Sequence, residues 1–173
     1  MAYLKRNHNS RLALDPTYPD IDYETFNIDK DCTHFYGDIS EAIPPKAPDP
    51  LGKSVYLRII ADSDHSGDKS TRSSCTGFMI FMNMSLINWL SKRQLTVETA
   101  VFRADFFAMK HGVETLRGLW YKLCMMGVPI AVPSYVYDDN MSVIHNTSNT
   151  AYVLNKKSNI ICYHFMRESL AAK

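Results

Sequence analysis

Several features that would indicate a particular class of protein are missing from this sequence. Its four cysteines are scattered and form no C-x-x-C pair, which argues against a disulfide framework and against a zinc site. No apolar stretch is long enough to span a membrane, and Met1 opens a polar segment unlike a signal sequence. We therefore expect reduced thiols and a protein without a membrane partner, located inside the cell in the cytoplasm or the nucleus.

Charge and glycine give little direct indication of a ligand. The net charge is +1 over 173 residues, so no overall basic field indicates nucleic acid. The seven glycines form no phosphate-binding loop, and no nucleophile elbow is present. Basic residues nevertheless recur locally, as at Lys92, Arg93 and Lys110. This pattern is compatible with nucleic-acid binding but does not demonstrate it.

Proline divides the chain into two parts. At 173 residues the chain is long enough for one domain of ordinary size with an appended arm. Residues 16–50 carry most of the prolines and few apolar runs, and proline removes backbone donors and blocks regular pairing. We expect residues 1–52 to form an irregular arm and residues 53–173 to form the domain.

The apolar pattern becomes regular from Lys53 onward. Short apolar runs predict strands, and a longer stretch with apolar residues three and four apart predicts a helix, which Gly112 or Gly118 can divide into two. A three-stranded meander followed by helix, strand and helix describes an α/β domain with a mixed sheet. The expected strands are 54–62, 76–82, 85–90 and 134–138, and the expected helices are 97–126, 140–146 and 160–171.

Carboxylates follow two of these strands. Asp62 ends the first, and Asp138 and Asp139 end the last. Clustered like charges repel in a low-dielectric cleft and are tolerated chiefly where a divalent metal neutralises them. Asp62 also suits an Asx turn at the start of the following loop, which is a purely structural explanation. Side chains alternate along a strand, so only one of Asp138 and Asp139 can face the first acid.

A third carboxylate, Asp105, interrupts the apolar face of the long helix, three residues after Phe102 and four before Met109. Charged residues are rarely fully buried without a partner. Asp105 is therefore either part of a polar site or an edge residue paired with Arg103, Lys110 or solvent. Carboxylates that converge from separate elements at one end of a sheet are what Mg²⁺ requires. Together the acids suggest a metal-dependent phosphoryl-transfer site.

Residues 60–72, IADSDHSGDKSTR, closely resemble the opening of the ribonuclease H domain in copia-type retrotransposon polyproteins. The resemblance covers residues 53–173, and the arm before it resembles the segment that joins the reverse transcriptase to the ribonuclease H domain. Because no polymerase active site is present, the chain resembles a C-terminal fragment of such a polyprotein. The further matching stretches are 76–78 (TGF), 89–94 (WLSKRQ), 106–110 (FFAMK), 137–140 (YDDN) and 163–168 (YHFMRE).

This resemblance implies a ribonuclease H-like fold, which is a mixed five-stranded sheet flanked by helices. It implies an endonuclease that hydrolyses the RNA strand of an RNA–DNA hybrid, with Mg²⁺ or Mn²⁺ ions activating a water and stabilising the leaving 3′ oxygen. On the family motif, the catalytic and metal-binding acids fall on Asp62, Asp105 and Asp139. The implied partners are the hybrid and the reverse transcriptase portion of the same element.

Two departures from the family pattern count against activity. The helix acid is normally glutamate, and Asp105 is one methylene shorter. The fourth acid of the family, three residues before the Tyr-His-Phe match, falls on Ile160. Metal sites tolerate little displacement of their ligands. An impaired nuclease is therefore one expectation, and the alternative is a catalytically inactive ribonuclease H-like domain that binds nucleic acid or a retroelement partner without cutting.

Overall fold

A computed structural model describes residues 12–22, 35–37, 39, 42–67, 70–95, 100–131, 133–149 and 160–172. The order of its elements agrees with the order expected from the apolar pattern. These elements are β1 (Leu57–Asp64), β2 (Cys75–Met82), β3 (Ser85–Arg93), α3 (Val101–Met125), β4 (Tyr135–Tyr137), α4 (Met141–Ser148) and α5 (Ile160–Ala171).

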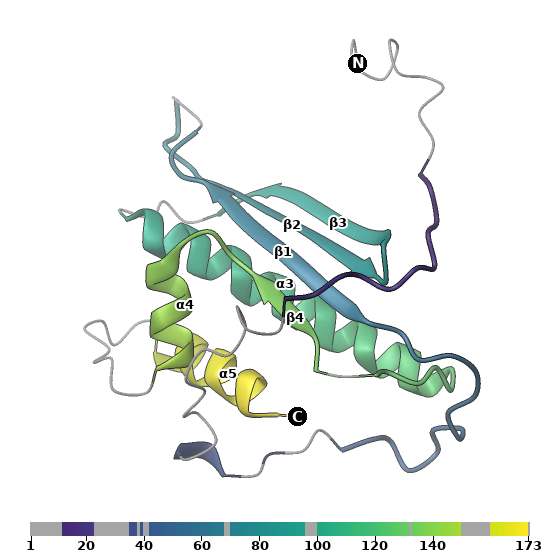
Figure 1. Cartoon of the computed structure of the whole chain (residues 1–173). Helices are drawn as coiled ribbons and strands as arrows, with labels where there is room; N and C mark the ends of the chain where they lie inside the picture. Colours follow the sequence, from purple (N-terminus) through teal and green to yellow (C-terminus); the bar gives the residue numbers. More distant parts are fainter. Residues whose placement is uncertain are drawn as a thin grey trace.

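The strands form one mixed sheet in the order β3-β2-β1-β4 (Figure 1). β1 pairs antiparallel with β2, β2 pairs antiparallel with β3, and β4 runs parallel to β1. The described residues contribute four strands, whereas the resemblance implies five, so the expected fifth strand is not part of the structure described. The α/β architecture itself is confirmed and is consistent with a ribonuclease H-like arrangement.

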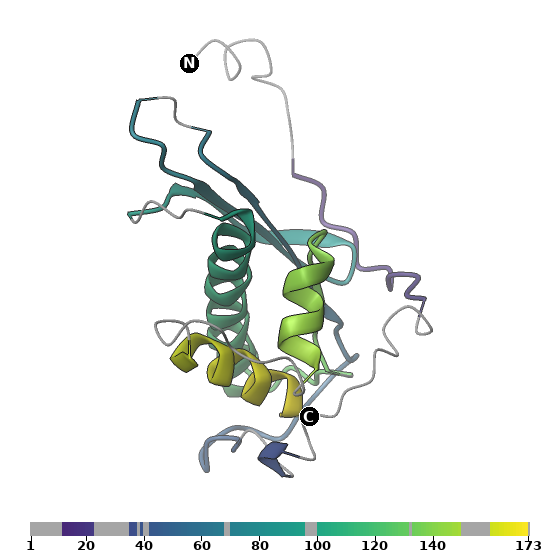
Figure 2. The same cartoon turned by 90° about the vertical axis from the view of Figure 1, so that its left-hand side faces the viewer.

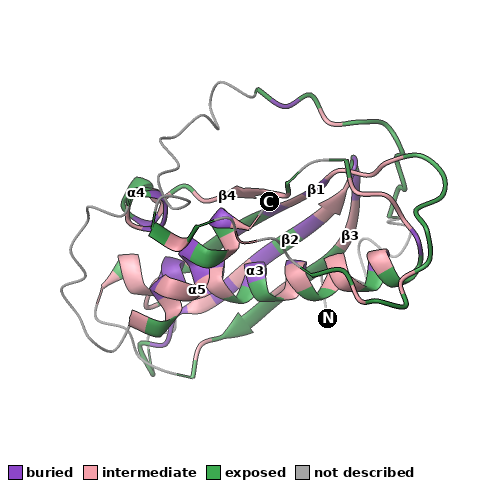
Figure 3. Cartoon of the chain, turned by 90° about the horizontal axis from the view of Figure 1, so that it is seen from below, coloured by how far each residue is buried: buried purple, intermediate pink, exposed green. Residues whose placement is uncertain are grey.

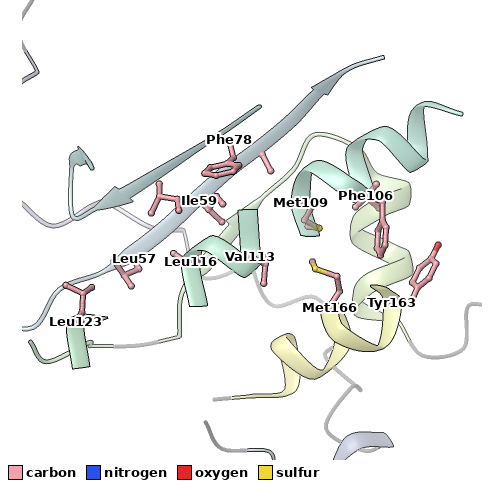
Figure 4. Close-up of a cluster of buried hydrophobic side chains, with 13 residues drawn as sticks. Leu57, Ile59, Phe78, Phe106, Met109, Val113, Leu116, Leu123, Tyr163 and Met166 are labelled. Atoms are coloured by element: carbon pink, nitrogen blue, oxygen red, sulfur yellow. The ribbon is translucent and has the colours of Figure 1, made fainter. Parts of the chain in front are cut away.

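The hydrophobic core lies between the sheet and α3. Alternate residues of β1, Leu57, Ile59 and Ala61, are buried, which is the period of two expected for a strand with one covered face. They pack against apolar residues of α3 such as Val113 and Leu116 (Figure 4). Helices α4 and α5 pack on α3 and on each other, on the same side of the sheet (Figure 2).

Helix α3 is continuous over 25 residues, so the expectation that Gly112 or Gly118 divides it was wrong. Gly112 is buried where the helix crosses β1, and a Cβ atom there would lie 2.4 Å from the Ile59 Cδ1 atom. The glycine therefore permits close approach of helix and sheet rather than a break. The mixture of buried and exposed positions along α3 is visible in Figure 3. None of the helices in the described part of the chain has the length and hydropathy of a membrane span.

The described parts of the expected arm contact the domain. The backbone N–H of Asp15 donates to Ser85 Oγ (2.7 Å), and Asn83 Nδ2 donates to the Pro16 carbonyl (3.1 Å). Asn83 occupies the β2–β3 turn with a φ of 56°, a left-handed conformation that asparagine tolerates well. Asp15 and Pro16 of the expected irregular arm therefore lie against the turn between β2 and β3.

Candidate active site at the end of the sheet

Asp105 lies in the first turns of α3 and is buried, with only 3% of its surface exposed. Ser63, on the helix-facing side of β1, donates a short hydrogen bond from its Oγ to Asp105 Oδ1. Asn140 donates from Nδ2 to Asp105 Oδ2 (2.8 Å). Asp105 is thus buried with a hydrogen-bond donor on each oxygen, and its role as a metal ligand stays a prediction. Of the alternative partners expected for an edge residue, solvent is excluded because Asp105 is buried, and Lys110 instead forms an ion pair with Glu114 (2.7 Å).

The end of β4 brings Asp138 and Asn140 to the same place. The backbone N–H of Asn140 donates to Asp138 Oδ1 (2.9 Å), while the Asn140 side chain accepts a hydrogen bond from the backbone N–H of Ser142 (3.0 Å). Asn140 thus caps α4, as its position before the helix predicted. The same side chain donates to Asp105. Its amide therefore links the end of β4, the start of α4 and the buried acid of α3.

Asp62 and Asp139 are both exposed. Asp62 alternates with Ala61 and Ser63, so it lies on the face of the sheet away from α3. There it lines a shallow groove together with Ile60, Met79 and Trp89, among others. The backbone N–H of Ser63 donates to Asp62 Oδ1 (2.7 Å), which is the local interaction expected of an aspartate at a strand end.

Three other acids of this region influence Asp138 electrostatically. Its pKa is raised from the ordinary value of 3.8 to about 6, and desolvation by burial is the largest cause. The hydrogen bond from the Asn140 backbone lowers the pKa. The carboxylates of Asp105, Asp139 and Asp62 raise it, since each disfavours a further negative charge.

A divalent cation such as Mg²⁺ needs several oxygen donors at one place. The available donors are oxygen atoms only, which is the ligand type that Mg²⁺ and Mn²⁺ prefer. Asp138 Oδ2 is buried and accepts no hydrogen bond from any described residue, so it is a donor atom without a partner. Within the described ranges, however, no three His, Cys, Asp or Glu side chains stand close enough to share a metal ion. The donor chemistry therefore suits a cation, while the described carboxylates are not gathered into one metal-binding group.

The raised pKa of Asp138 makes a prediction for the stability of the protein in EDTA. Because the pKa in the folded state lies above the ordinary value, folding favours the protonated carboxyl. This stabilisation is complete below pH 3.8 and is lost as the pH rises through about 6. With allowance for solvent screening of a partly exposed group, the loss is about 1 kcal/mol between about pH 5 and about pH 7. Asp138→Asn should remove it.

Chemical denaturation of both proteins in EDTA at the two pH values measures this loss. Because other groups titrate in both proteins, the informative quantity is the difference between wild type and variant. If that difference is the same at both pH values, Asp138 has no raised pKa.

The sequence did not predict that Ser63 and Asn140 donate hydrogen bonds to Asp105. The signal for Ser63 was the alternation of β1, which places residues 57, 59, 61 and 63 on the helix-facing side. Ile160, where the family has its fourth acid, is the first residue of α5 and is partly buried. The replacement of the family's fourth acid by isoleucine therefore lies at the first residue of α5.

Comparison with known proteins identifies relatives of the chain. No protein-family model matches it. It is 24% identical over 119 residues, 69% of the chain, to each of the retrovirus-related Pol polyproteins from transposons RE1 and RE2 of Arabidopsis thaliana. It is 28% identical over 118 residues, 68% of the chain, to the retrovirus-related Pol polyprotein from transposon TNT 1-94 of Nicotiana tabacum.

The chain spans only 8% to 9% of the length of these curated relatives. The similarity is thus confined to one segment of a much longer polyprotein. The three polyproteins are of the same kind, and each matches 68% to 69% of the chain. This agrees with the family resemblance of the sequence motifs. Over about two thirds of its length, the chain is similar to one segment of these retrovirus-related Pol polyproteins of transposons.

Proposed function

We propose that this chain is the ribonuclease H-type segment of a copia-type Pol polyprotein, with a ribonuclease H-like fold, and that it hydrolyses the RNA strand of RNA–DNA hybrids. The main support is that carboxylates from separate elements lie within electrostatic reach of Asp138, which follows β4: Asp105 from α3 and Asp62 from β1. The order of the family motifs along the chain adds to this support.

In this proposal Asp62, Asp105 and Asp139 hold Mg²⁺ or Mn²⁺. When bound, such a cation polarises the phosphate and lowers the pKa of an attacking water. Buried Asp105 is fixed by two donors and supplies a rigid carboxylate. Asp62 and Asp139 are exposed, and Asp138 is a partly buried carboxylate within electrostatic reach of both. No protein nucleophile is required, because water attacks.

The test is cleavage of a labelled RNA strand, annealed to DNA, in the presence of Mg²⁺ or Mn²⁺ and again in EDTA. The proposal predicts cutting with either metal and none in EDTA. A folded protein that leaves the RNA intact under all metal conditions would overturn the nuclease assignment. The reverse transcriptase portion of the same element, if added, would serve as the protein partner that the family resemblance implies.

The hydrogen bonds and the length of the Asp105 side chain favour a second candidate function, which is binding without cleavage. Both of its oxygens already accept hydrogen bonds, its side chain is shorter than that of the family's glutamate, and Ile160 replaces the fourth acid. These features suit a domain that binds the hybrid without cutting it. Binding of this kind depends on phosphate contacts and weakens steeply as salt increases. Filter binding across a salt series measures it, and absent binding at low salt would exclude this function.

Restoring the family acids separates the two candidates. We expect Asp105→Glu combined with Ile160→Asp to increase metal-dependent cleavage at least about tenfold, because the completed ligand set holds the cation better. The matched control combines Asp105→Glu with Ile161→Asp, since Ile161 is the next residue and is 83% exposed. Equal rates for the two double variants would show that position 160 does not supply a ligand.

A further inference from the structure

Helices α3, α4 and α5 all lie on one side of the sheet, and no described helix covers its other face, called the outer face below (Figure 2). Alternation along β1 places Arg58, Ile60 and Asp62 on the outer face. The strand registers align Ile60 with Met79 of β2, and Met79 with Trp89 of β3. These three apolar side chains form a row across the sheet and are 38%, 41% and 60% exposed. A contiguous exposed apolar row of this kind marks an interaction surface.

Two charged residues of β1 flank this row. The Arg58 guanidinium lies 4.9 Å from the centroid of the Phe81 ring, and its Nη2 donates to Met84 Sδ (3.2 Å). Its Nε is buried and has no hydrogen-bond partner within the described residues, and the ion pairs of this part of the chain do not include Arg58. Among the same residues, Asp62 accepts a hydrogen bond from the neighbouring Ser63 backbone. Since a buried N–H without an acceptor is costly, Arg58 calls for an acceptor that another molecule can supply.

The order of these residues on β1 is self-complementary. A two-fold axis along the apolar row places β1 of a second copy antiparallel to β1 of the first. Arg58 and Asp62 are each two residues from Ile60, which is about 6.6 Å along a strand. Arg58 of one copy therefore faces Asp62 of the other, and the pair occurs twice because the interface is isologous. Sheets packed face to face lie about 10 Å apart with their strands within about 30° of one another, a gap that an arginine side chain can cross.

We propose that the outer face is the interface of a symmetric dimer of this chain, with the apolar row at its centre and two Arg58–Asp62 ion pairs between the copies. A second copy suits this face better than nucleic acid, because Asp62 and the exposed Asp64 beside it repel phosphates. Asp62 is engaged in the dimer, so the dimer and a nuclease that uses Asp62 are alternative states of the chain. The inference does not rest on the proposed function, because association is measured without metal or hybrid.

The size of the outer face sets the expected strength of the dimer. β1 and β2 are eight residues long, which is about 26 Å, and the described sheet is four strands wide. Leu12 of the arm lines the same groove as Met79 and Trp89 and widens the apolar surface. Interfaces smaller than about 800 Å² per partner are weak or transient. We therefore expect a dimer that forms at micromolar protein concentrations and dissociates on dilution.

Sedimentation equilibrium of the full chain in EDTA, over a concentration series centred on the micromolar range, measures this association. The wild type should pass from monomer to dimer as its concentration rises. Met79→Lys should raise the dissociation constant at least about tenfold, because it places two like charges at the centre of the interface. Met125→Lys is the matched control, since Met125 lies on α3 and is 48% exposed, close to the 41% of Met79. This control should associate as the wild type does.

Exchange of the two charges tests the ion pairs themselves. Arg58→Asp and Asp62→Arg should each raise the dissociation constant at least about tenfold, because each brings like charges face to face between the copies. The double variant restores opposite charges across the axis and should associate nearly as tightly as the wild type. A thermal melt shows that each variant is folded. Should Arg58→Asp not fold, Asp62→Arg and Met79→Lys, both at exposed positions, still carry the test.

A wild-type chain that stays monomeric over the whole series would overturn the dimer and leave the proposed function standing. Association that Met79→Lys leaves unchanged would place the contact on another surface and would also overturn it. Loss of association in both single exchanges without recovery in the double variant would overturn the ion pairs. A monomeric chain whose Met79→Lys variant binds a labelled RNA–DNA hybrid more tightly or more weakly than Met125→Lys would assign the outer face to nucleic acid instead.

Discussion

Asp62→Asn is expected to reduce metal-dependent cleavage of an RNA–DNA hybrid at least about 100-fold, since losses up to this size follow even from changes to the partners of metal ligands. Asparagine keeps the size of the side chain but removes its negative charge. A hard cation requires that charge on its oxygen ligands. Because Asp62 is exposed, the substitution should leave the fold intact. Initial cleavage rates with Mg²⁺, beside a thermal melt of each protein, measure both effects.

Asp64→Asn is the matched control for this prediction. Asp64 is also exposed, lies on the same strand and belongs to the same face as Asp62. Its carboxylate lies against Gly67 in the following loop, and the family resemblance gives it no catalytic role. We expect its variant to cleave at nearly the wild-type rate. Equal losses in both variants would mean that general negative charge at this end of β1, rather than Asp62 itself, supports cleavage.

Phe106→Ala is expected to have the largest effect on stability. Phe106 is fully buried next to Asp105, and its ring centroid lies 4.6 Å from that of Tyr163 (Figure 4). The ring centroid of Phe102 lies 5.9 Å away. This cluster joins α3 to α5. Removing the ring leaves a cavity in addition to the lost burial, so the free energy of unfolding should fall by about 3–5 kcal/mol. Urea denaturation measures the loss.

Phe35→Ala provides the comparison of the same residue type at an exposed site. Phe35 is 68% exposed, so its truncation should change the free energy of unfolding by about 0.5 kcal/mol or less. A loss for Phe106→Ala as small as that for Phe35→Ala would contradict the packing of α5 on α3.

The arrangement of strands and helices was largely predictable from the sequence. Alternating residues of β1 and the apolar repeats of α3 have the periods of a half-covered strand and an amphipathic helix, and both elements formed where these periods occur. Gly112 was misinterpreted because a local rule treats glycine as a helix breaker. Its actual role, close approach to Ile59, depends on a contact between elements 53 residues apart in sequence.

The candidate site was predictable only in part, for a related reason. Acids at the ends of β1 and β4 and within α3 are visible as residues that interrupt apolar patterns. The hydrogen-bond partners of these acids are not visible in the sequence, because the bond from Ser63 to Asp105 joins residues 42 positions apart. Which of Asp138 and Asp139 lies closer to Asp105 also depends on how β4 ends, and the structure places Asp138 in the more buried position.

The central claim is tested most directly by offering the wild-type protein the same labelled RNA in three forms: annealed to DNA, annealed to RNA, and single-stranded. The account predicts that Mg²⁺ or Mn²⁺ supports cutting of the RNA in the hybrid, that the other two forms are spared, and that EDTA stops the reaction. No cutting of the hybrid by a protein that melts cooperatively, or equal cutting of all three forms, would contradict a ribonuclease H-type function.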